Sequence, residues 1–279
     1  MRYDLPMTFQ QPPLKDIRAL ASDLDGTLLG SDGQIPKRNA SAIAFAQSQG
    51  ITTFAATARS PRSTTRIARS ANLESLAVCA NGAIGYLTKE DKYLWHDTLN
   101  VSDITSIIKM ARDAFPNTYF ALEYGTEFFY EEGFFPDTVF INDVTTVPDI
   151  LQVERSRATK LVCRSNGVTQ NRIKEVILNS AELEIAISYG STDWVEILPP
   201  GVSKGTGVLK ACDYLGIEAS SLACVGDHLN DLPMFDVSGI SAAVANAHPS
   251  TLEKATWTVA SNDECGVAEV LARVSGVKR

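Results

Sequence analysis

The 279-residue sequence predicts an α/β protein whose parallel-sheet core is interrupted by an inserted α+β module. In the first and last thirds of the chain, short apolar runs alternate with helical patterns, which is the order of a parallel sheet with crossover helices. The middle third is rich in aromatic residues and mixes strand and helix patterns without strict alternation. We therefore expect a core at 17–85 and 190–279 and an insert at 86–189.

The first third alternates three expected strands with two expected helices. The strands are short apolar runs at 17–24, 51–57 and 75–80. The helices are expected at 36–50 and 60–71, each with a proline near its first turn. Gly50 ends the first helix, and Ser60 is a candidate cap for the second.

The last third resumes this alternation. An apolar stripe that includes Val208 and Cys212 predicts a helix at 203–216, with Ser203 as its possible cap. A turn that enters a short helix is expected at 227–238. The remaining elements are expected strands at 221–225, 240–245 and 257–260, and expected helices that start at 249 and 266.

The middle third predicts an α+β module. Helices are expected at 102–115 and 170–180, and strands at 157–164 and 182–190. Aromatic residues on both sides of Gly125 favour a hairpin. We expect these aromatic side chains to form the core of the insert, with a platform for substrate as the less favoured alternative.

Composition narrows the classes of partner. The net charge of −8 argues against a nucleic-acid-binding surface. No apolar run reaches the ~20 residues needed to cross a bilayer, so no membrane partner is expected. Five scattered cysteines without a C-x-x-C pair predict the reduced thiols of a cytoplasmic protein. Residues 1–16 are expected to form a loose leader, or alternatively an ordered arm.

Acidic side chains gather where strands end, at the edge where open parallel sheets bind ligands. Asp23 and Asp25 stand two positions apart and start out on the same side of their strand. They repel each other unless a cation or a shared proton resolves the conflict. Asp227 and Asp231 are four apart and share a face if the segment is helical. Such an oxygen-rich cluster suits Mg²⁺.

Groups that suit a phosphate accompany these carboxylates. Lys204 adds a positive charge, Thr57 adds a hydroxyl donor, and the helix expected near Ser60 adds backbone N–H groups for an anion. Together they predict phosphoryl transfer. One aspartate can act as the nucleophile and form an aspartyl-phosphate, while a second protonates the leaving oxygen and later deprotonates water.

Four segments resemble the motifs of the haloacid dehalogenase (HAD) superfamily, namely DLDGTLL from 23, TARS from 57, SKG from 203 and GDHLNDLPMF from 226. The NGA at 81–83 and the C-terminal VANAHPSTLEKATW segment are similar to the Cof-type phosphatases of subfamily IIB. The resemblance covers 17–85 and 190–279. It implies a Rossmann-like core with an inserted α+β cap of the C2 type.

The resemblance also implies roles for the acidic residues. Asp23 corresponds to the nucleophile and a Mg²⁺ ligand. Asp25 corresponds to the general acid/base, with its backbone carbonyl on the metal. Asp227 corresponds to a further Mg²⁺ ligand, and Asp231 to a residue that supports the metal's water shell.

By the same resemblance, Thr57 and Lys204 are expected to bind the transferring phosphoryl group. Asn81 and Asn230 are expected to contact the phosphate or to order its loops. One position departs from the family pattern, because Ala58 stands where glycine often follows the threonine.

Other charged residues carry weaker expectations. Glu196 precedes the lysine loop and is a minor candidate for contact with substrate or cap. A solvated strand face is expected for the basic residues of the insert, with a second anionic group of the substrate as the alternative; these are Arg155, Arg157, Lys160 and Arg164.

Three functions are therefore considered. The favoured one is a Mg²⁺-dependent phosphatase of small phosphorylated metabolites such as sugar phosphates. The alternatives are a phosphomutase, which in phosphomannomutases uses a similar core and cap, and a non-catalytic regulator that binds phosphometabolites. The presence of Asp25 as a proton donor favours catalysis over mere binding.

Overall fold

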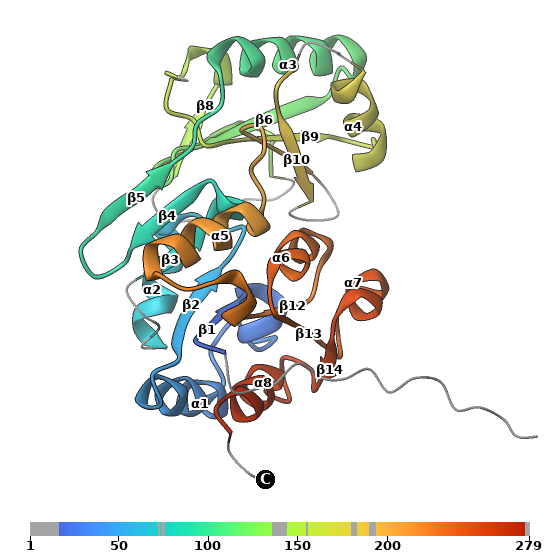
Figure 1. Cartoon of the computed structure of the whole chain (residues 1–279). Helices are drawn as coiled ribbons and strands as arrows, with labels where there is room; N and C mark the ends of the chain where they lie inside the picture. The colour runs from blue at the N-terminus through green and yellow to red at the C-terminus, as the bar shows by residue number, and fades with distance from the viewer. Residues whose placement is uncertain are drawn as a thin grey trace, which may run out of the picture.

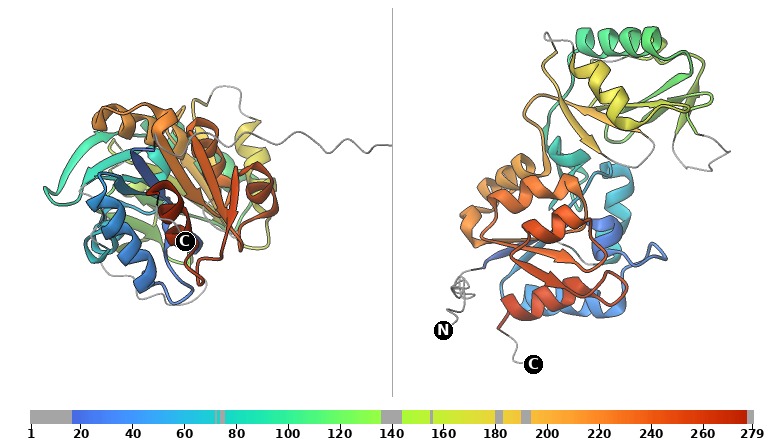
Figure 2. Two further views of the ribbon diagram at one scale, coloured as in Figure 1. Left: turned by 60° about the horizontal axis from the view of Figure 1, so that its bottom comes forward. Right: turned by 90° about the vertical axis from the view of Figure 1, so that its right-hand side faces the viewer.

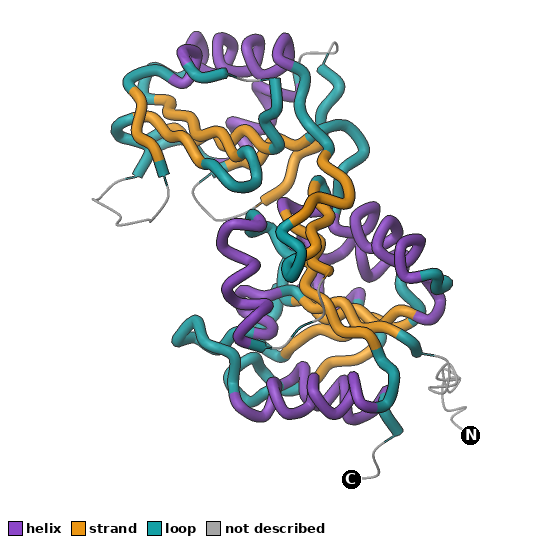
Figure 3. The backbone as a smooth tube through the Cα atoms, turned by 90° about the vertical axis from the view of Figure 1, so that its left-hand side faces the viewer, coloured by secondary structure: helices purple, strands orange, loops and turns teal. Residues whose placement is uncertain are grey.

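The computed structural model describes residues 17–71, 73, 76–135, 144–154, 156–179, 183–189 and 194–276. These residues form two lobes, each built on its own sheet (Figure 1). Figure 3 shows the same two lobes from another side. The leader expected at 1–16 lies outside the described residues.

The larger lobe contains an eight-stranded sheet in the order β14-β13-β12-β1-β2-β3-β4-β5. From β14 to β3 every pairing is parallel, and the chain proceeds outward from β1 in both directions. The boundary between β1 and β12 is thus the point where the strand order reverses, which is where open α/β sheets bind ligands. The strands are β1 (Ala19–Ser22), β2 (Thr52–Ala56), β3 (Leu76–Cys79), β4 (Ile84–Leu87), β5 (Lys92–His96), β12 (Leu222–Gly226), β13 (Ile240–Val244) and β14 (Trp257–Val259).

Helices cover this sheet because its central strands are buried along their whole length and need apolar partners on both faces. They are α1 (Lys37–Ser48), α2 (Pro61–Ser70), α5 (Lys204–Leu215), α6 (Leu232–Val237), α7 (Pro249–Lys254) and α8 (Gly266–Val274). Ser203 caps α5 as predicted, since its Oγ accepts a hydrogen bond from the Thr206 amide at 3.1 Å. Ser60 forms no side-chain cap on α2 and instead hydrogen-bonds Glu123 of the insert.

The smaller lobe has a six-stranded sheet in the order β10-β11-β9-β6-β7-β8, and all its pairings except β7–β8 are antiparallel. Its elements are α3 (Val101–Ala114), β6 (Thr118–Glu123), β7 (Phe128–Glu131), β8 (Thr145–Val147), β9 (Lys160–Ser165), α4 (Gln170–Leu178), β10 (Ala186–Tyr189) and β11 (Val195–Leu198). Helices α3 and α4 pack on the face that points away from the larger lobe (Figures 1 and 2). The predicted α/β core with an α+β insert is confirmed.

The change of lobe lies at different residues from those expected. Strands β4 and β5 continue the larger sheet to His96, past the boundary expected at 85. Strand β11 belongs to the smaller sheet, although 190–279 was assigned to the core. We therefore propose an insert of residues 97–198. Within the described residues, no helix is both long and apolar enough to cross a bilayer.

Candidate active site

The two central strands of the larger sheet end side by side. Ser22 of β1 lies opposite Val225 of β12, and the Asp23 amide donates to the Val225 carbonyl at 2.9 Å. The loops that follow the two strands therefore leave the sheet at the same edge. This register brings Asp23 next to the loop that begins at Asp227.

A buried lysine joins two of the predicted acids. Lys204, the first residue of α5, donates from Nζ to Oδ1 of Asp23 and to Oδ1 of Asp231, each at 2.6 Å. All three side chains are almost fully buried. Carboxylate oxygens of Asp23, Asp227 and Asp231 lie within 4.8 Å of one another. The structure thus brings together four residues from three separate predicted motifs.

The two oxygens of Asp231 are already engaged. Oδ1 accepts from Lys204, and Oδ2 accepts from the backbone amides of Asp227 and His228 at 2.9 and 3.0 Å. A turn at 229–231, and not a shared helix face, brings Asp227 and Asp231 together. Asp231 thus orders the loop and the lysine, which leaves Asp23 and Asp227 as the available carboxylate ligands. This hard oxygen donor set fits Mg²⁺.

Glycine allows the two loops to approach closely. Gly26 has φ +76°, and a Cβ at this position would lie 2.5 Å from Oδ2 of Asp227. A Cβ on Gly226 would lie 2.5 Å from Oδ2 of Asp231. The contact between the DLDGT and GDHLND segments therefore requires Gly26, and the close turn within GDHLND requires Gly226.

The local electrostatics favour a further cation. Burial, together with the neighbouring carboxylates, raises the pKa of Asp23 well above its usual range, although Lys204 opposes this. Burial also raises the pKa of Asp227 to about 6. Burial alone would lower the pKa of Lys204, but Asp23 and Asp231 outweigh it and raise that pKa. One ammonium group therefore faces three carboxyl groups.

The Asp25 side chain is not part of the cluster around Lys204. Its carboxylate accepts two hydrogen bonds from the Arg59 guanidinium, at 2.5 and 2.7 Å, and it remains partly exposed. Two parallel N–H···O bonds fix both groups in orientation. Thr57 is buried two residues before Arg59, and its Oγ1 accepts from the Arg59 amide at 3.1 Å. Arg59 thus links the predicted acid/base to the threonine loop.

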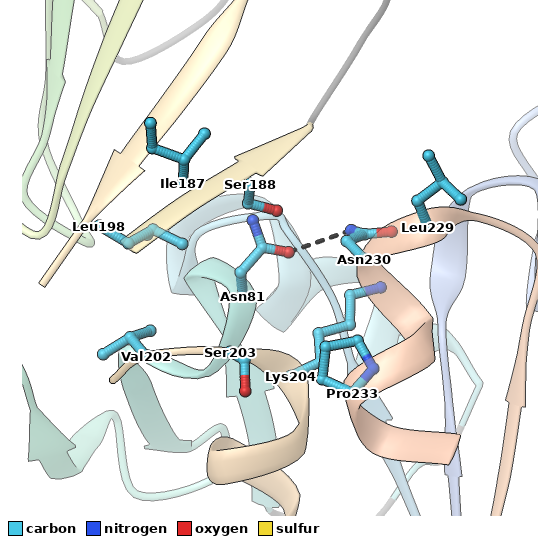
Figure 4. A pocket seen from close by; sticks show the side chains of 10 residues that line it. All are labelled: Asn81, Ile187, Ser188, Leu198, Val202, Ser203, Lys204, Leu229, Asn230 and Pro233. Carbon is cyan, nitrogen blue, oxygen red and sulfur yellow. Dashed lines mark hydrogen bonds between the residues drawn. The ribbon is translucent and has the colours of Figure 1, made fainter. Parts of the chain in front are cut away.

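Asn81 connects the two lobes. It has φ +54° and lies in a buried turn after β3. Its Oδ1 accepts from Asn230 at 3.1 Å, and its Nδ2 donates to Glu196 of β11 at 2.7 Å. Figure 4 shows the two asparagines reaching toward each other, below Ile187 and Ser188 of β10. They line a cavity of about 160 Å³ together with Lys204.

Lys160 does not lie on a solvated strand face. It is buried, donates to Glu196 at 2.7 Å, and lies 3.3 Å from the Ala58 carbonyl of the larger lobe. Glu196 therefore accepts hydrogen bonds from both lobes. The expectation failed because a charged residue in a strand is usually solvated, and only the pairing of β9 with β11 brings its carboxylate partner within reach.

A second cavity of about 460 Å³ lies between the lobes beside Arg59. The larger lobe contributes Ala58, Arg59, Ser60, Arg62 and Ser63, and the insert contributes aromatic and charged side chains. Sequence reasoning assigned no role to Arg59 or Glu123. The position of Arg59 two residues after Thr57, the predicted phosphate-binding threonine, is a usable signal, whereas nothing local marks Glu123.

A family model of haloacid dehalogenase-like hydrolases matches residues 20–271. The chain belongs to this family. It is 26% identical over 266 residues to the 5-amino-6-(5-phospho-D-ribitylamino)uracil phosphatase YcsE of Bacillus subtilis, covering 92% of this chain and 95% of that protein.

Solved structures share this fold of the HAD family. The phosphatase BT1666 of Bacteroides thetaiotaomicron matches with a TM-score of 0.82 at 21% identity, covering 99% of this chain and all of that one. The subclass IIB sugar phosphatase BT4131 matches with a TM-score of 0.78 at 19% identity, covering 91% and 97%. The predicted family is confirmed, and the family and its relatives support a phosphatase of small phosphorylated substrates.

Proposed function

We propose that this HAD hydrolase is a Mg²⁺-dependent phosphatase that releases phosphate from small phosphorylated metabolites through an aspartyl-phosphate on Asp23. The observation that carries the proposal is the buried contact of Lys204 with Asp23 and Asp231, beside Asp227 at the strand-order reversal. The similarity to a phosphatase of a phosphorylated ribitylaminouracil supports a small-molecule substrate. Five free cysteines suit a cytoplasmic location.

Two carboxylates divide the chemistry. A carboxylate oxygen of Asp23 attacks phosphorus, and the bond from phosphorus to the leaving oxygen breaks. Protonated Asp25 gives its proton to that oxygen. Water then attacks the aspartyl-phosphate while Asp25 takes a proton from the water, and the bond between Asp23 and phosphorus breaks to release inorganic phosphate.

The other site residues orient the phosphoryl group and offset its charge. Lys204 holds Asp23 in place and faces the phosphoryl oxygens. Thr57, Asn81 and Asn230 supply hydrogen-bond donors at the rim of the site. Asp23, Asp227 and the Asp25 carbonyl would hold Mg²⁺, which when bound neutralises negative charge on the phosphoryl group.

The test is a phosphate-release screen over many phosphomonoesters, with and without Mg²⁺. Asp23→Asn should lower release by at least about a thousandfold while circular dichroism shows an intact fold. Asp236→Asn, at a half-exposed acid on α6, is the matched control. Full activity of Asp23→Asn, with deamidation excluded by mass spectrometry, would contradict the assignment. Interconversion of hexose phosphates with little phosphate release would identify a mutase instead.

A further inference from the structure

The six-stranded sheet of the smaller lobe, here called the cap sheet, presents one face to the cavity beside Arg59. Side chains two positions apart share a face of a strand. Glu123 of β6 lies opposite Phe128 of β7 and Lys160 of β9, and Val162 lies opposite Glu196 of β11. All five side chains line the cavity of about 460 Å³. The other face of the sheet packs on α3 and α4.

Aromatic rings form one wall of this cavity. They belong to Phe128, Phe134, Phe135 and Trp194. The rings of Phe134 and Phe135 lie edge to face with their centroids 4.9 Å apart, and the centroid of the Trp194 ring lies 6.2 Å from that of Phe134. Three of the four, all except Phe134, are only partly buried. The prediction that the aromatic residues are insert core thus holds for Phe120 and its neighbours on the helix-covered face and for Phe134, whereas Phe128, Phe135 and Trp194 offer ring surface to a ligand.

A buried carboxyl group lies in the same cavity. Glu123 is 5% exposed and accepts a hydrogen bond from the Gly125 amide at 3.1 Å. It also hydrogen-bonds Ser60. Lys160, its neighbour across the strands, is committed to Glu196 at 2.7 Å. Glu123 therefore keeps acceptor capacity for an N–H or O–H group of a ligand that stacks on the rings.

The opposite end of the cavity leads to the proposed chemistry. Arg59 lines the cavity and holds Asp25, which would protonate the leaving oxygen. A leaving group bound here therefore extends from the acid/base toward the aromatic wall. The volume of about 460 Å³ falls within the range of pockets that bind small molecules.

We propose, on the basis of the phosphatase function above, that this cavity selects substrates whose leaving group carries a flat aromatic or heteroaromatic ring. The ring stacks on Trp194 and Phe128, and a donor on its edge reaches Glu123. A bare sugar phosphate leaves that wall without a partner, so it binds more weakly.

The test compares pairs of phosphorylated ligands, of which only one member carries a flat aromatic or heteroaromatic ring. Flavin mononucleotide is paired with D-ribitol 5-phosphate, and uridine 5′-monophosphate with D-ribose 5-phosphate. Binding is measured by titration calorimetry with Mg²⁺ and the Asp23→Asn variant, so that turnover plays no part. The ring-bearing member of at least one pair should bind at least tenfold more tightly, which equals about 1.4 kcal/mol. Preferences below tenfold in both pairs would overturn the inference.

Substitutions in the same background locate the preference. Trp194→Ala and Phe128→Ala should each reduce the ratio of the two affinities at least fivefold. Tyr119→Ala is the matched control, since Tyr119 lies on the same face of the cap sheet but does not line the cavity. An unchanged ratio in both cavity variants would place ring binding elsewhere and refute the inference.

Failure of the inference and failure of the proposed function give different results. Phosphate release by the wild-type protein is measured separately, with p-nitrophenyl phosphate and the four ligands above. No release from any ester contradicts the phosphatase function, while the binding ratios still decide the ring preference. Equal release from both members of each pair, together with equal binding, contradicts only the ring preference.

Discussion

Replacement of Lys204 by methionine tests the electrostatic design of the site. The unbranched methionine side chain retains much of the volume but removes the charge. Nζ of Lys204 lies 2.6 Å from both Asp23 and Asp231, and the three side chains are 1%, 7% and 0% exposed. Without the ammonium group, two carboxyl groups remain buried beside Asp227 with no cationic partner.

The expected loss is large because the pair is buried. Removal of one partner of a buried ion pair costs about 3–5 kcal/mol of unfolding free energy. The raised pKa of Asp23 means that Asp23 binds a proton more tightly in the folded protein than in the unfolded chain. Its contribution to stability therefore falls as the pH rises toward its pKa in the folded protein. Since Lys204 opposes the rise in the Asp23 pKa, removal of the ammonium group raises that pKa further. The loss should therefore be greater at pH 8 than at pH 5.

Urea unfolding without Mg²⁺, followed by circular dichroism at both pH values, measures the effect. Lys254→Met is the matched control, because its pair with Asp236 has the same 2.6 Å separation but is half exposed. That control should lose only about 0–1 kcal/mol. If Lys204→Met costs no more than Lys254→Met, or if its loss is greater at pH 5, the reasoning about the buried cluster is wrong.

Three other predictions concern the contacts between motifs and lobes. Arg59→Met should lower kcat/KM for phosphate release at least about tenfold because Asp25 loses its bidentate partner. The free energy of unfolding in urea should change by less than about 1 kcal/mol because that pair is partly exposed. Unaltered kinetics would disprove the role of Arg59 in holding Asp25. Glu196→Gln should cost about 3–5 kcal/mol in urea unfolding because it removes the charged partner that lies 2.7 Å from the buried Lys160, and a wild-type midpoint would argue against that pair. Burial raises the pKa of Glu123 from 4.5 to about 7, so the wild-type protein should lose stability as the pH rises from 4.5 to 7. Glu123→Gln should lack this loss in urea unfolding curves measured from pH 4.5 to 8. Parallel pH profiles for the two proteins would rule out such a titration.

Mg²⁺ offers an independent check on the acidic cluster. A ligand that binds only the folded state raises the unfolding free energy by RT ln(1 + L/Kd), where L is the concentration of free ligand. Because Asp227 is an available ligand whereas Asp231 is occupied by Lys204 and two amides, Asp227→Asn should abolish the stabilisation by Mg²⁺. Retained stabilisation in thermal denaturation with and without the ion would contradict the ligand set.

The strand ends could be predicted because their signals are local. Apolar runs that stop at Asp23, Thr57 and Asp227 mark the edge of a parallel sheet, and that edge collects all its loops at one side. The boundary expected at 85 falls inside β4 and divides the β4–β5 hairpin for a related reason. An antiparallel edge is added through a short turn, so the alternation of strand and helix gives no sign of it.

The sequence by itself determined the α/β core, the inserted lobe and the acidic and basic groups at the sheet edge, because periodicity and short motifs are properties of neighbouring residues. Only the tertiary structure decided that Arg59 holds Asp25, that Glu196 joins Lys160 to Asn81, and that Glu123 faces an aromatic cavity. These partners lie tens of residues apart and meet through strand register and the approach of two lobes. No local pattern of residues encodes contacts between segments so far apart in the sequence.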